Sequence, residues 1–285
     1  MYMDQYSVLG NPVQHSKSPL IFRLFAEQTQ QALQYSATFV DREGLADALA
    51  SFQSQGGKGV NITLPFKHRA VAAVDSLSER AQRAEAVNVI TFNEDGSRLG
   101  DNTDGVGLVR DILINKRFSI KGKRVLILGA GGAVRGIIDP LFSENPTELV
   151  IANRTESKAV ALAEEFSDVG LIQACPLDLL ENNSFDLVIN GTSASLQDEM
   201  LDLPGSILKE NALCYDMVYG RGMTPFLRWA KEQDALFCVD GLGMLVEQAA
   251  EAFYLWRNVK PDTQPVLAAL NATMPMNLES SAAPL

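Results

Sequence analysis

Lys67 is a residue whose type and setting suit catalysis. It ends the stretch NITLPFK, residues 61–67, in which proline and phenylalanine follow an apolar, strand-like segment. An ammonium within reach of a substrate oxygen can stabilise negative charge or donate a proton. Because Pro65 also suits the first turn of a helix, Lys67 could instead be a solvated helical side chain. The other polar residues of the chain must decide between these interpretations.

Several polar residues lie inside apolar segments near this lysine. Asn61 and Thr63 are two positions apart and therefore share one face of a strand, and Asn88 interrupts the apolar stretch AVNVI. Buried polar groups are costly unless each finds a partner. Any one of them could pair with the backbone, but several converging indicate a polyhydroxylated ligand.

Two hydroxyls and two carboxylates complete this group of candidates. Ser16 and Ser18 precede Pro19, which makes Ser18 a good helix N-cap and leaves Ser16 without a structural role. A helix N-terminus with two hydroxyls also suits a carboxylate ligand. In GDNTDGVG, Asp101 is expected at a hairpin end or interdomain turn without chemistry. Asp104 would by default cap a helix, but it falls where two domains are expected to meet.

A glycine-rich turn indicates a dinucleotide site. Gly129 and Gly131 follow the apolar strand RVLIL and open a helix, where backbone N–H groups can approach a pyrophosphate. Val134 stands at the third glycine position of the usual pattern, so a tight turn without a ligand remains the alternative.

The end of the next strand indicates which dinucleotide binds. At the position where NAD-binding folds usually carry an acidic residue, the chain has Asn153 followed by Arg154, with Lys158 one helical turn on. A guanidinium pairs well with a 2′-phosphate, so NADP is favoured over NAD. Alternatively, Asn153 and Thr155 cap the helix and Arg154 is solvated.

The elements that must position these residues fall into two series. Residues 6–77 alternate strand-like and helix-like runs, including a helix over 66–77. Two strands around Asp95 and Gly96 predict a hairpin and thus a mixed sheet. Beyond a helix reaching residue 117, apolar strands without alternation predict a parallel sheet covered by helices on both faces. The residues after Thr273 have the composition of a disordered tail.

Composition narrows the function classes. The 285 residues carry a net charge of -11, which argues against nucleic-acid or anionic-membrane surfaces. We expect a cytoplasmic protein, because the N-terminus lacks a signal-peptide pattern, no apolar run could span a membrane, and the odd number of cysteines suits reduced, buried thiols. No metal site is predicted.

Taken in order, these motifs resemble one family. GNPVQHSKSP, NITLPFK, AVN, GDNTDGVG, GAGGA, NRTESK, YDMVYGRGMTPFL and DGLGMLVEQAA are similar to the signatures of the shikimate dehydrogenases, bacterial NADP-dependent enzymes of aromatic amino-acid biosynthesis. The chain differs from the family pattern at Phe22, where many members carry histidine, at Val89, which replaces a frequent threonine, and in NGTSASL, residues 190–196.

The resemblance implies an α/β fold of two domains. Residues 1–104 plus 246–285 would form a mixed-sheet substrate domain, and residues 105–245 a doubly wound, Rossmann-like NADP domain. It implies a small-molecule substrate, no nucleic-acid or membrane partner, and a monomer or homodimer. Lys67 and Asp104 would be the catalytic pair. The implied substrate-binding residues are Ser16, Ser18, Asn61, Thr63, Asn88, Asp104, Tyr219 and Gln248. The implied cofactor-binding residues are Gly129, Ala130, Gly131, Gly132, Ala133, Asn153, Arg154, Thr155, Lys158, Thr192, Met217 and Gly241.

The reaction implied is the reversible reduction of 3-dehydroshikimate to shikimate by NADPH. In this interpretation Lys67 stabilises or protonates the oxygen of the reacting ketone, and Asp104 accepts a hydrogen bond from a substrate hydroxyl and holds the ammonium in place. Two alternatives stay open at this point: a quinate/shikimate dehydrogenase that uses NAD, and a non-catalytic NADPH-binding sensor.

Overall fold

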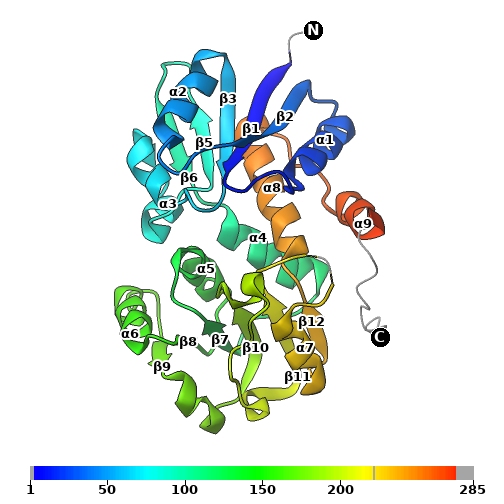
Figure 1. The fold of residues 1–285 in the computed structure, drawn as a ribbon. Helices are drawn as coiled ribbons and strands as arrows, with labels where there is room; N and C mark the ends of the chain where they lie inside the picture. The colour runs from blue at the N-terminus through cyan, green and yellow to red at the C-terminus, as the bar shows by residue number, and fades with distance from the viewer. Residues whose placement is uncertain (1–2, 221, 274–285) are drawn as a thin grey trace. The chain divides into compact units, whose positions relative to one another are not determined.

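A computed structural model describes residues 3–220 and 222–273. Backbone contacts divide the chain into two compact units (Figure 1). Within the described residues, the first unit comprises residues 3–107 with Leu245–Val266, and the second comprises Leu108–Met244 with residues 267–273. The extent of the two functional domains stays a prediction, and the predicted disordered tail lies outside the described residues.

The first unit is built on a mixed sheet, as predicted, with strand order β2-β1-β3-β5-β6-β4. β1 pairs in parallel with β2 and β3, whereas β5 pairs antiparallel with both β3 and β6. The hairpin predicted around Asp95 and Gly96 is the β5–β6 connection. The strands are β1 (Asp4–Gly10), β2 (Leu33–Phe39), β3 (Gly57–Ile62), β4 (Ser76–Leu77), β5 (Val89–Phe92) and β6 (Arg98–Asp101).

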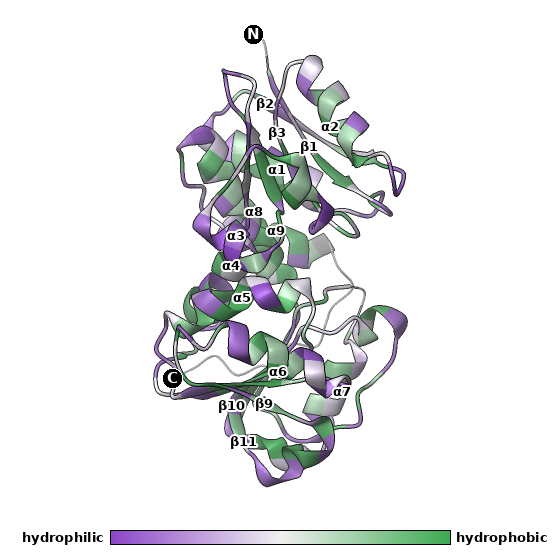
Figure 2. Ribbon diagram, turned by 90° about the vertical axis from the view of Figure 1, so that its left-hand side faces the viewer, coloured by the Kyte–Doolittle hydropathy of each residue, from purple (hydrophilic) through white to green (hydrophobic). Residues whose placement is uncertain are grey.

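One helix of this unit, α3, begins at a recognisable local signal. Ser78 caps α3, because its hydroxyl accepts a hydrogen bond from the N–H of Ala81. Figure 2 shows α3 in purple, as expected for its charged and polar residues, whereas green stretches mark apolar strands. The helices are α1 (Ser18–Thr29), α2 (Leu45–Ser54), α3 (Glu79–Ala84), α4 (Asp104–Arg110), α8 (Leu242–Arg257) and α9 (Gln264–Thr273); the division between units falls within α4, α8 and α9.

The predicted helix over residues 66–77 is wrong. The segment forms a short 3-10 helix, Arg69–Ala73, and then β4, whose two residues pair with Leu99 and Gly100 of β6. Lys67 is also tied down, since its carbonyl accepts the N–H of Val87 at 2.9 Å. Pairing with residues distant in sequence therefore overrides the local helical pattern.

The second unit is a doubly wound parallel sheet, as predicted, with strand order β12-β11-β10-β7-β8-β9. β7 lies at its centre, so the chain winds first to one edge and then to the other. The strands are β7 (Arg124–Leu128), β8 (Glu148–Ala152), β9 (Ile172–Cys175), β10 (Phe185–Asn190), β11 (Leu208–Asp216) and β12 (Phe237–Val239), and its helices include α5 (Gly132–Phe142), α6 (Glu156–Glu165) and α7 (Pro225–Glu232).

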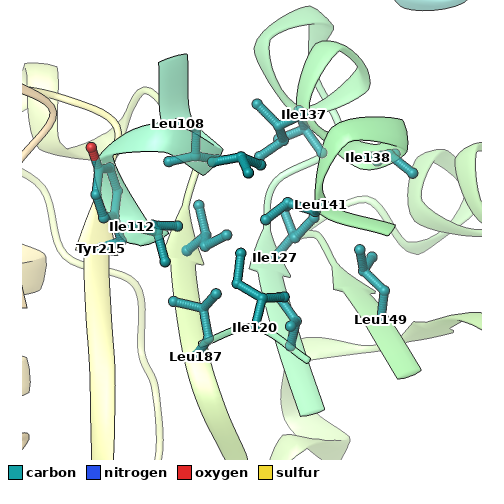
Figure 3. Close-up of a cluster of buried hydrophobic side chains, with 14 of the residues drawn as sticks. Leu108, Ile112, Ile120, Ile127, Ile137, Ile138, Leu141, Leu149, Leu187 and Tyr215 are labelled. Carbon is teal, nitrogen blue, oxygen red and sulfur yellow. The ribbon is translucent and has the colours of Figure 1, made fainter. Parts of the chain in front are cut away.

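Both faces of this parallel sheet are buried, which explains why its strands lack polar alternation. Val125 and Ile127 of β7 point into one apolar cluster, shown in Figure 3, and Leu126 and Leu128 point into another on the opposite face. All four are fully buried. Burial on both sides holds the sheet rigid and places its strand ends, where the candidate cofactor residues lie, at defined positions.

Candidate active site

Lys67 and Asp104 form an ion pair within the first unit. Lys67 lies beyond β3, after the turn over residues 63–66, and Asp104 is the first residue of α4. The Lys67 Nζ lies 2.7 Å from the Asp104 Oδ2. The lysine side chain is 25% exposed and the aspartate side chain 7% exposed. The carboxylate is therefore enclosed by protein, while part of the lysine side chain stays exposed.

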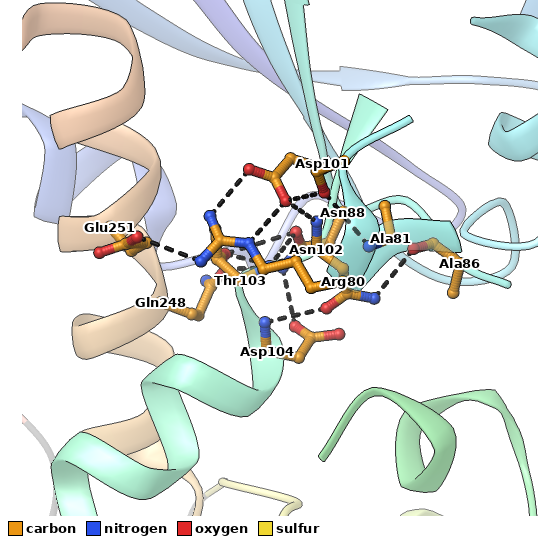
Figure 4. Close-up of polar contacts among 11 residues, drawn as sticks. Arg80, Ala81, Ala86, Asn88, Asp101, Asn102, Thr103, Asp104, Gln248 and Glu251 are labelled. Atoms are coloured by element: carbon orange, nitrogen blue, oxygen red, sulfur yellow. Dashed lines mark hydrogen bonds and ion pairs between the residues drawn. The ribbon is translucent and has the colours of Figure 1, made fainter. Parts of the chain in front are cut away.

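Asn88 holds the other oxygen of this carboxylate. Its Nδ2 lies 2.8 Å from the Asp104 Oδ1 and 3.1 Å from the Gln248 Oε1 of α8 (Figure 4). Its own Oδ1 accepts the backbone N–H of Thr103 at 2.9 Å. Asn88 is only 2% exposed. Because acceptors surround the nitrogen and a donor faces the oxygen, the orientation of this amide is defined, and it leaves Asp104 fixed between an ammonium and an amide.

By default Asp104 was expected to cap α4 with its carboxylate. It does not do so. The backbone N–H of Asp104 instead donates to the Oδ1 of Asn102 at 3.0 Å, and the Nδ2 of Asn102 donates to the carbonyl of Ala86 at 2.9 Å. Asn102 thus fixes the helix start. The two oxygens of the Asp104 side chain are bound instead by Lys67 and Asn88.

Arg80 supports this arrangement, and its role was missed in the sequence. Its Nε and Nη2 lie 2.6 and 2.8 Å from the two oxygens of Asp101, and its Nη1 lies 3.2 Å from the Oε1 of Glu251. Burial tends to raise the pKa of Asp101, but hydrogen bonds from Arg80 and Ser78 outweigh it and hold the pKa below its usual value. The arginine joins α3, β6 and α8, the elements that carry the site.

Ser16, Ser18, Asn61 and Thr63 also lie in the first unit. The first turn of α1 has no side-chain cap, so the expectation that Ser18 caps it is wrong. The Oγ of Ser16 instead accepts the N–H of Ser18 at 3.2 Å. Asn61, 6% exposed, accepts a hydrogen bond from the hydroxyl of Tyr35 at 2.6 Å and donates to the carbonyl of Asn88 at 3.1 Å. The predicted polar cluster therefore extends from β3 to the start of β5.

The glycine turn of the second unit has the form that a pyrophosphate requires. Gly129 follows β7 with a φ of +107°, which favours glycine, and a Cβ there would lie 3.2 Å from the carbonyl carbon of Gly191. Gly131 occupies the N-cap of α5 without a side-chain cap, and a Cβ there would meet no described atom within 4 Å. Space is thus left at the N-terminus of α5, where Val134 is the first residue whose N–H donates within the turn, to the carbonyl of Gly131, so an anion could approach the preceding N–H groups.

Two exposed cations lie at the end of the neighbouring strand. Arg154 and Lys158 follow β8, and neither forms an ion pair with another described residue. The side chain of Thr155, at the N-cap of α6, accepts no capping hydrogen bond, and the Nδ2 of Asn153 donates to the Thr155 carbonyl at 2.9 Å. This segment can therefore present positive charge to a phosphate on the ribose of a dinucleotide.

The remaining predicted cofactor residues lie at the carboxyl ends of β10, β11 and β12. Thr192 donates from its N–H and its hydroxyl to the Oδ1 of Asn190, at 3.1 and 2.7 Å. A Cβ on Gly241 would lie 2.3 Å from the carbonyl oxygen of Met217, so only glycine fits there. Tyr219 is in the same unit, and burial followed by the charge of Asp240 raises its pKa.

Asp216 organises these strand ends and was also missed in the sequence. It is fully buried, and its Oδ2 accepts the hydroxyls of Ser195 and Thr224 at 2.7 and 2.6 Å. Its Oδ1 accepts the N–H of Val218 at 3.0 Å. The signal in the sequence was an aspartate at the end of the apolar run ALCYD. Among the described residues, no cluster of three or more histidine, cysteine or acidic side chains could hold a metal ion.

The chain matches three family models of known proteins. Residues 8–90 match the shikimate dehydrogenase substrate binding domain, residues 112–201 match shikimate / quinate 5-dehydrogenase, and residues 241–270 match the shikimate 5′-dehydrogenase C-terminal domain. No helix within the described residues is long and apolar enough to cross a membrane.

Individual relatives are similar in sequence to nearly the whole chain. A shikimate dehydrogenase (NADP(+)) of Cellvibrio japonicus is 55% identical, over 94% of this chain and 96% of its own length, and one of Nitrosococcus oceani is 51% identical over 99% of both. A crystal structure of shikimate 5-dehydrogenase from Thermus thermophilus, in complex with NADP(H) and shikimate, is 35% identical over 95% of this chain and 99% of that chain, with a TM-score of 0.84.

Proposed function

The chain belongs to the shikimate dehydrogenase family, and we propose that it catalyses the reversible, NADPH-dependent reduction of 3-dehydroshikimate to shikimate with Lys67 and Asp104 as its catalytic pair. The reaction is a step of aromatic amino-acid biosynthesis. The single observation that carries the assignment of the pair is the 2.7 Å contact between an accessible ammonium and an enclosed carboxylate.

Lys67 handles the charge that develops on the reacting oxygen. Reduction of a ketone turns the carbonyl oxygen toward an alkoxide, and an ammonium within hydrogen-bond reach stabilises it or donates a proton to it. The exposed part of Lys67 supports this role, because the Nζ can contact Asp104 and a ligand together. Donation of the proton leaves Lys67 as a neutral amine, and in the direction of oxidation this amine accepts the hydroxyl proton and becomes the ammonium again.

Asp104 orients the lysine and accepts from the substrate. Lys67 and Asn88 each contact one of its oxygens, and every carboxylate oxygen can accept a second hydrogen bond. A substrate hydroxyl next to the reacting carbon can therefore donate to Asp104 while Lys67 contacts the reacting oxygen. This two-point contact would place the carbon that exchanges hydride.

The other polar residues of the first unit suit the rest of a hydroxylated acid. Ser16, Ser18, Asn61, Thr63 and Asn88 supply hydroxyl and amide groups, and we propose that they bind the carboxylate and hydroxyls of shikimate. The chain as a whole is acidic, so such local donors are needed for an anionic substrate. Gln248 and Tyr219 are proposed as further substrate contacts.

The second unit has the residues that NADP requires. When bound, the nicotinamide supplies the hydride that the protein itself lacks. The N–H groups at the start of α5 and the glycines at Gly129 and Gly131 suit its pyrophosphate, and Arg154 with Lys158 suits its 2′-phosphate. Thr192, Met217 and Gly241 are proposed as contacts to the remainder of the cofactor.

Steady-state kinetics with shikimate and NADP, followed by absorbance at 340 nm, test the proposal. Lys67→Ala should lower kcat by roughly 10²- to 10⁴-fold with little change in KM, which is the usual contribution of a general acid. Lys58→Ala, on an exposed position of β3, is the matched control and should retain kcat. A Lys67→Ala variant with nearly full kcat would refute the catalytic assignment.

Crossing shikimate and quinate with NADP and NAD measures the breadth of the activity. We propose that NADP with shikimate is the preferred pair, and a preference for NAD would favour a quinate/shikimate dehydrogenase instead. A cytoplasmic location and a monomeric or homodimeric state are also proposed. Light scattering on the purified protein distinguishes the two oligomeric states.

A further inference from the structure

Tyr35 lies in the polar cluster of the first unit, although nothing in the sequence pattern assigned it a role. It belongs to β2, the edge strand that pairs with β1. Its ring stacks on Phe22 with centroids 4.1 Å apart and planes 9° apart. The ring is thus held in place by apolar packing, and its hydroxyl reaches Asn61 of β3.

The hydrogen bonds of this hydroxyl have a defined direction. The Nδ2 of Asn61 lies 3.1 Å from the backbone carbonyl of Asn88, which can only accept, so the amide nitrogen must face it. The Oδ1 of Asn61 therefore faces Tyr35, and the phenol donates to it at 2.6 Å. Burial raises the pKa of the Tyr35 phenol well above its usual value, so the proton is present at neutral pH.

The bonds run in one direction, from the Tyr35 hydroxyl to the Asn61 Oδ1 and from the Asn61 Nδ2 to the carbonyl of Asn88. The second N–H of Asn61 has no partner among the described residues, so it is the group that the cluster can present to a ligand oxygen.

We infer that Tyr35 is a positioning residue for substrate binding: its hydroxyl sets the amide orientation of Asn61, so that Asn61 offers an N–H donor to an oxygen of a hydroxylated acid. This inference rests on the proposed function. The ring is needed for packing and the oxygen for orientation. Removing the oxygen alone leaves the Asn61 Oδ1 without its donor and frees the amide to rotate.

Tyr35→Phe is the test, because it deletes the oxygen and retains the ring that stacks on Phe22. Titration calorimetry with shikimate should show a Kd raised about 5- to 30-fold, the range for a lost buried hydrogen bond. The KM for shikimate should rise in parallel, while the KM for NADP should stay within about twofold. Tyr6→Phe is the matched control. Tyr6, on the adjacent β1, also stacks on an aromatic ring, Trp256 at 4.6 Å, and its hydroxyl accepts from Arg257 and, among the described residues, makes no hydrogen bond to Asn61.

A second comparison separates positioning from a general structural effect. If Tyr35 acts through Asn61, Tyr35→Phe should add little to the loss of shikimate affinity already caused by Asn61→Ala. A Tyr35→Phe protein with wild-type affinity for shikimate, or with equal losses for shikimate and NADP, would overturn the inference. Wild-type protein that binds shikimate without turnover would refute the proposed reaction but leave the role of Tyr35 to be decided by the measured Kd.

Discussion

Replacing Arg80 by glutamine removes the cation that crosslinks three elements around the candidate site. In the structure its guanidinium contacts both oxygens of Asp101, at 2.6 and 2.8 Å, and a third nitrogen contacts Glu251. The Arg80 side chain is 30% exposed and that of Asp101 is 10% exposed. We expect Arg80→Gln, Asp101→Asn and the double variant to form an informative double-mutant cycle.

The geometry sets the size of the coupling. Two unit charges about 4 Å apart interact by about 4 kcal/mol at an effective dielectric constant of about 20. Breaking a buried ion pair costs about 3–5 kcal/mol, but nearly a third of Arg80 is exposed, so solvent screens part of its charge. We therefore expect a coupling free energy of about 2 kcal/mol at pH 7, because the contact is bidentate.

The coupling should depend on pH in one direction. The pKa of Asp101 is lower in the folded protein than in the unfolded chain. Its stabilising contribution is therefore fully present above the unfolded value and is lost as the pH falls through the folded value. Arg80→Gln should consequently differ most from wild type at neutral pH, and the difference should shrink in acid below the usual aspartate pKa of about 3.9.

Urea unfolding followed by fluorescence measures these free energies. In a Trp229→Phe background the remaining tryptophan, Trp256, reports on the first unit. The exposed pair of Arg69 and Glu43, with side chains 51% and 85% exposed, is the matched control and should show coupling of at most about 0.5 kcal/mol. A coupling for Arg80 and Asp101 no larger than that of the control pair, or one unchanged in acid, would refute this reasoning.

Three further variants test the second unit. Arg154→Ala should raise the KM for NADP about tenfold or more and leave that for NAD nearly unchanged, because only the 2′-phosphate needs the guanidinium; equal effects on both cofactors would contradict this role. Gly241→Ala should lower the thermal midpoint and weaken NADP binding, since its Cβ would lie 2.3 Å from the Met217 carbonyl oxygen, whereas a wild-type midpoint would show that the backbone can shift freely. Ile127→Ala, at the fully buried centre of the sheet, should cost about 2–5 kcal/mol in urea unfolding, and a loss below about 1 kcal/mol would mean that the core closes over the cavity.

Elements whose residues carry their own local signal could be predicted well. The strand RVLIL and the hairpin at Asp95 and Gly96 were predicted correctly, because continuous apolar runs and turn residues act over a few positions. β9 was not found, since its four residues IQAC have no such pattern. The helix predicted over residues 66–77 was wrong, because the end of this segment forms β4 and pairs with β6.

The sequence alone determined which kinds of groups were available for chemistry: an ammonium, a carboxylate, several amides and hydroxyls, a glycine turn, and a guanidinium after a strand. These depend on residue type and short spacing, which are local properties. Only the tertiary structure decided which groups meet. Asn88 contacts Gln248, and Arg80 contacts Glu251, across more than half of the chain, and Tyr35 meets Asn61 through parallel strands that cross over. Such contacts follow from the packing of sheets and helices, so no local sequence pattern could have predicted them.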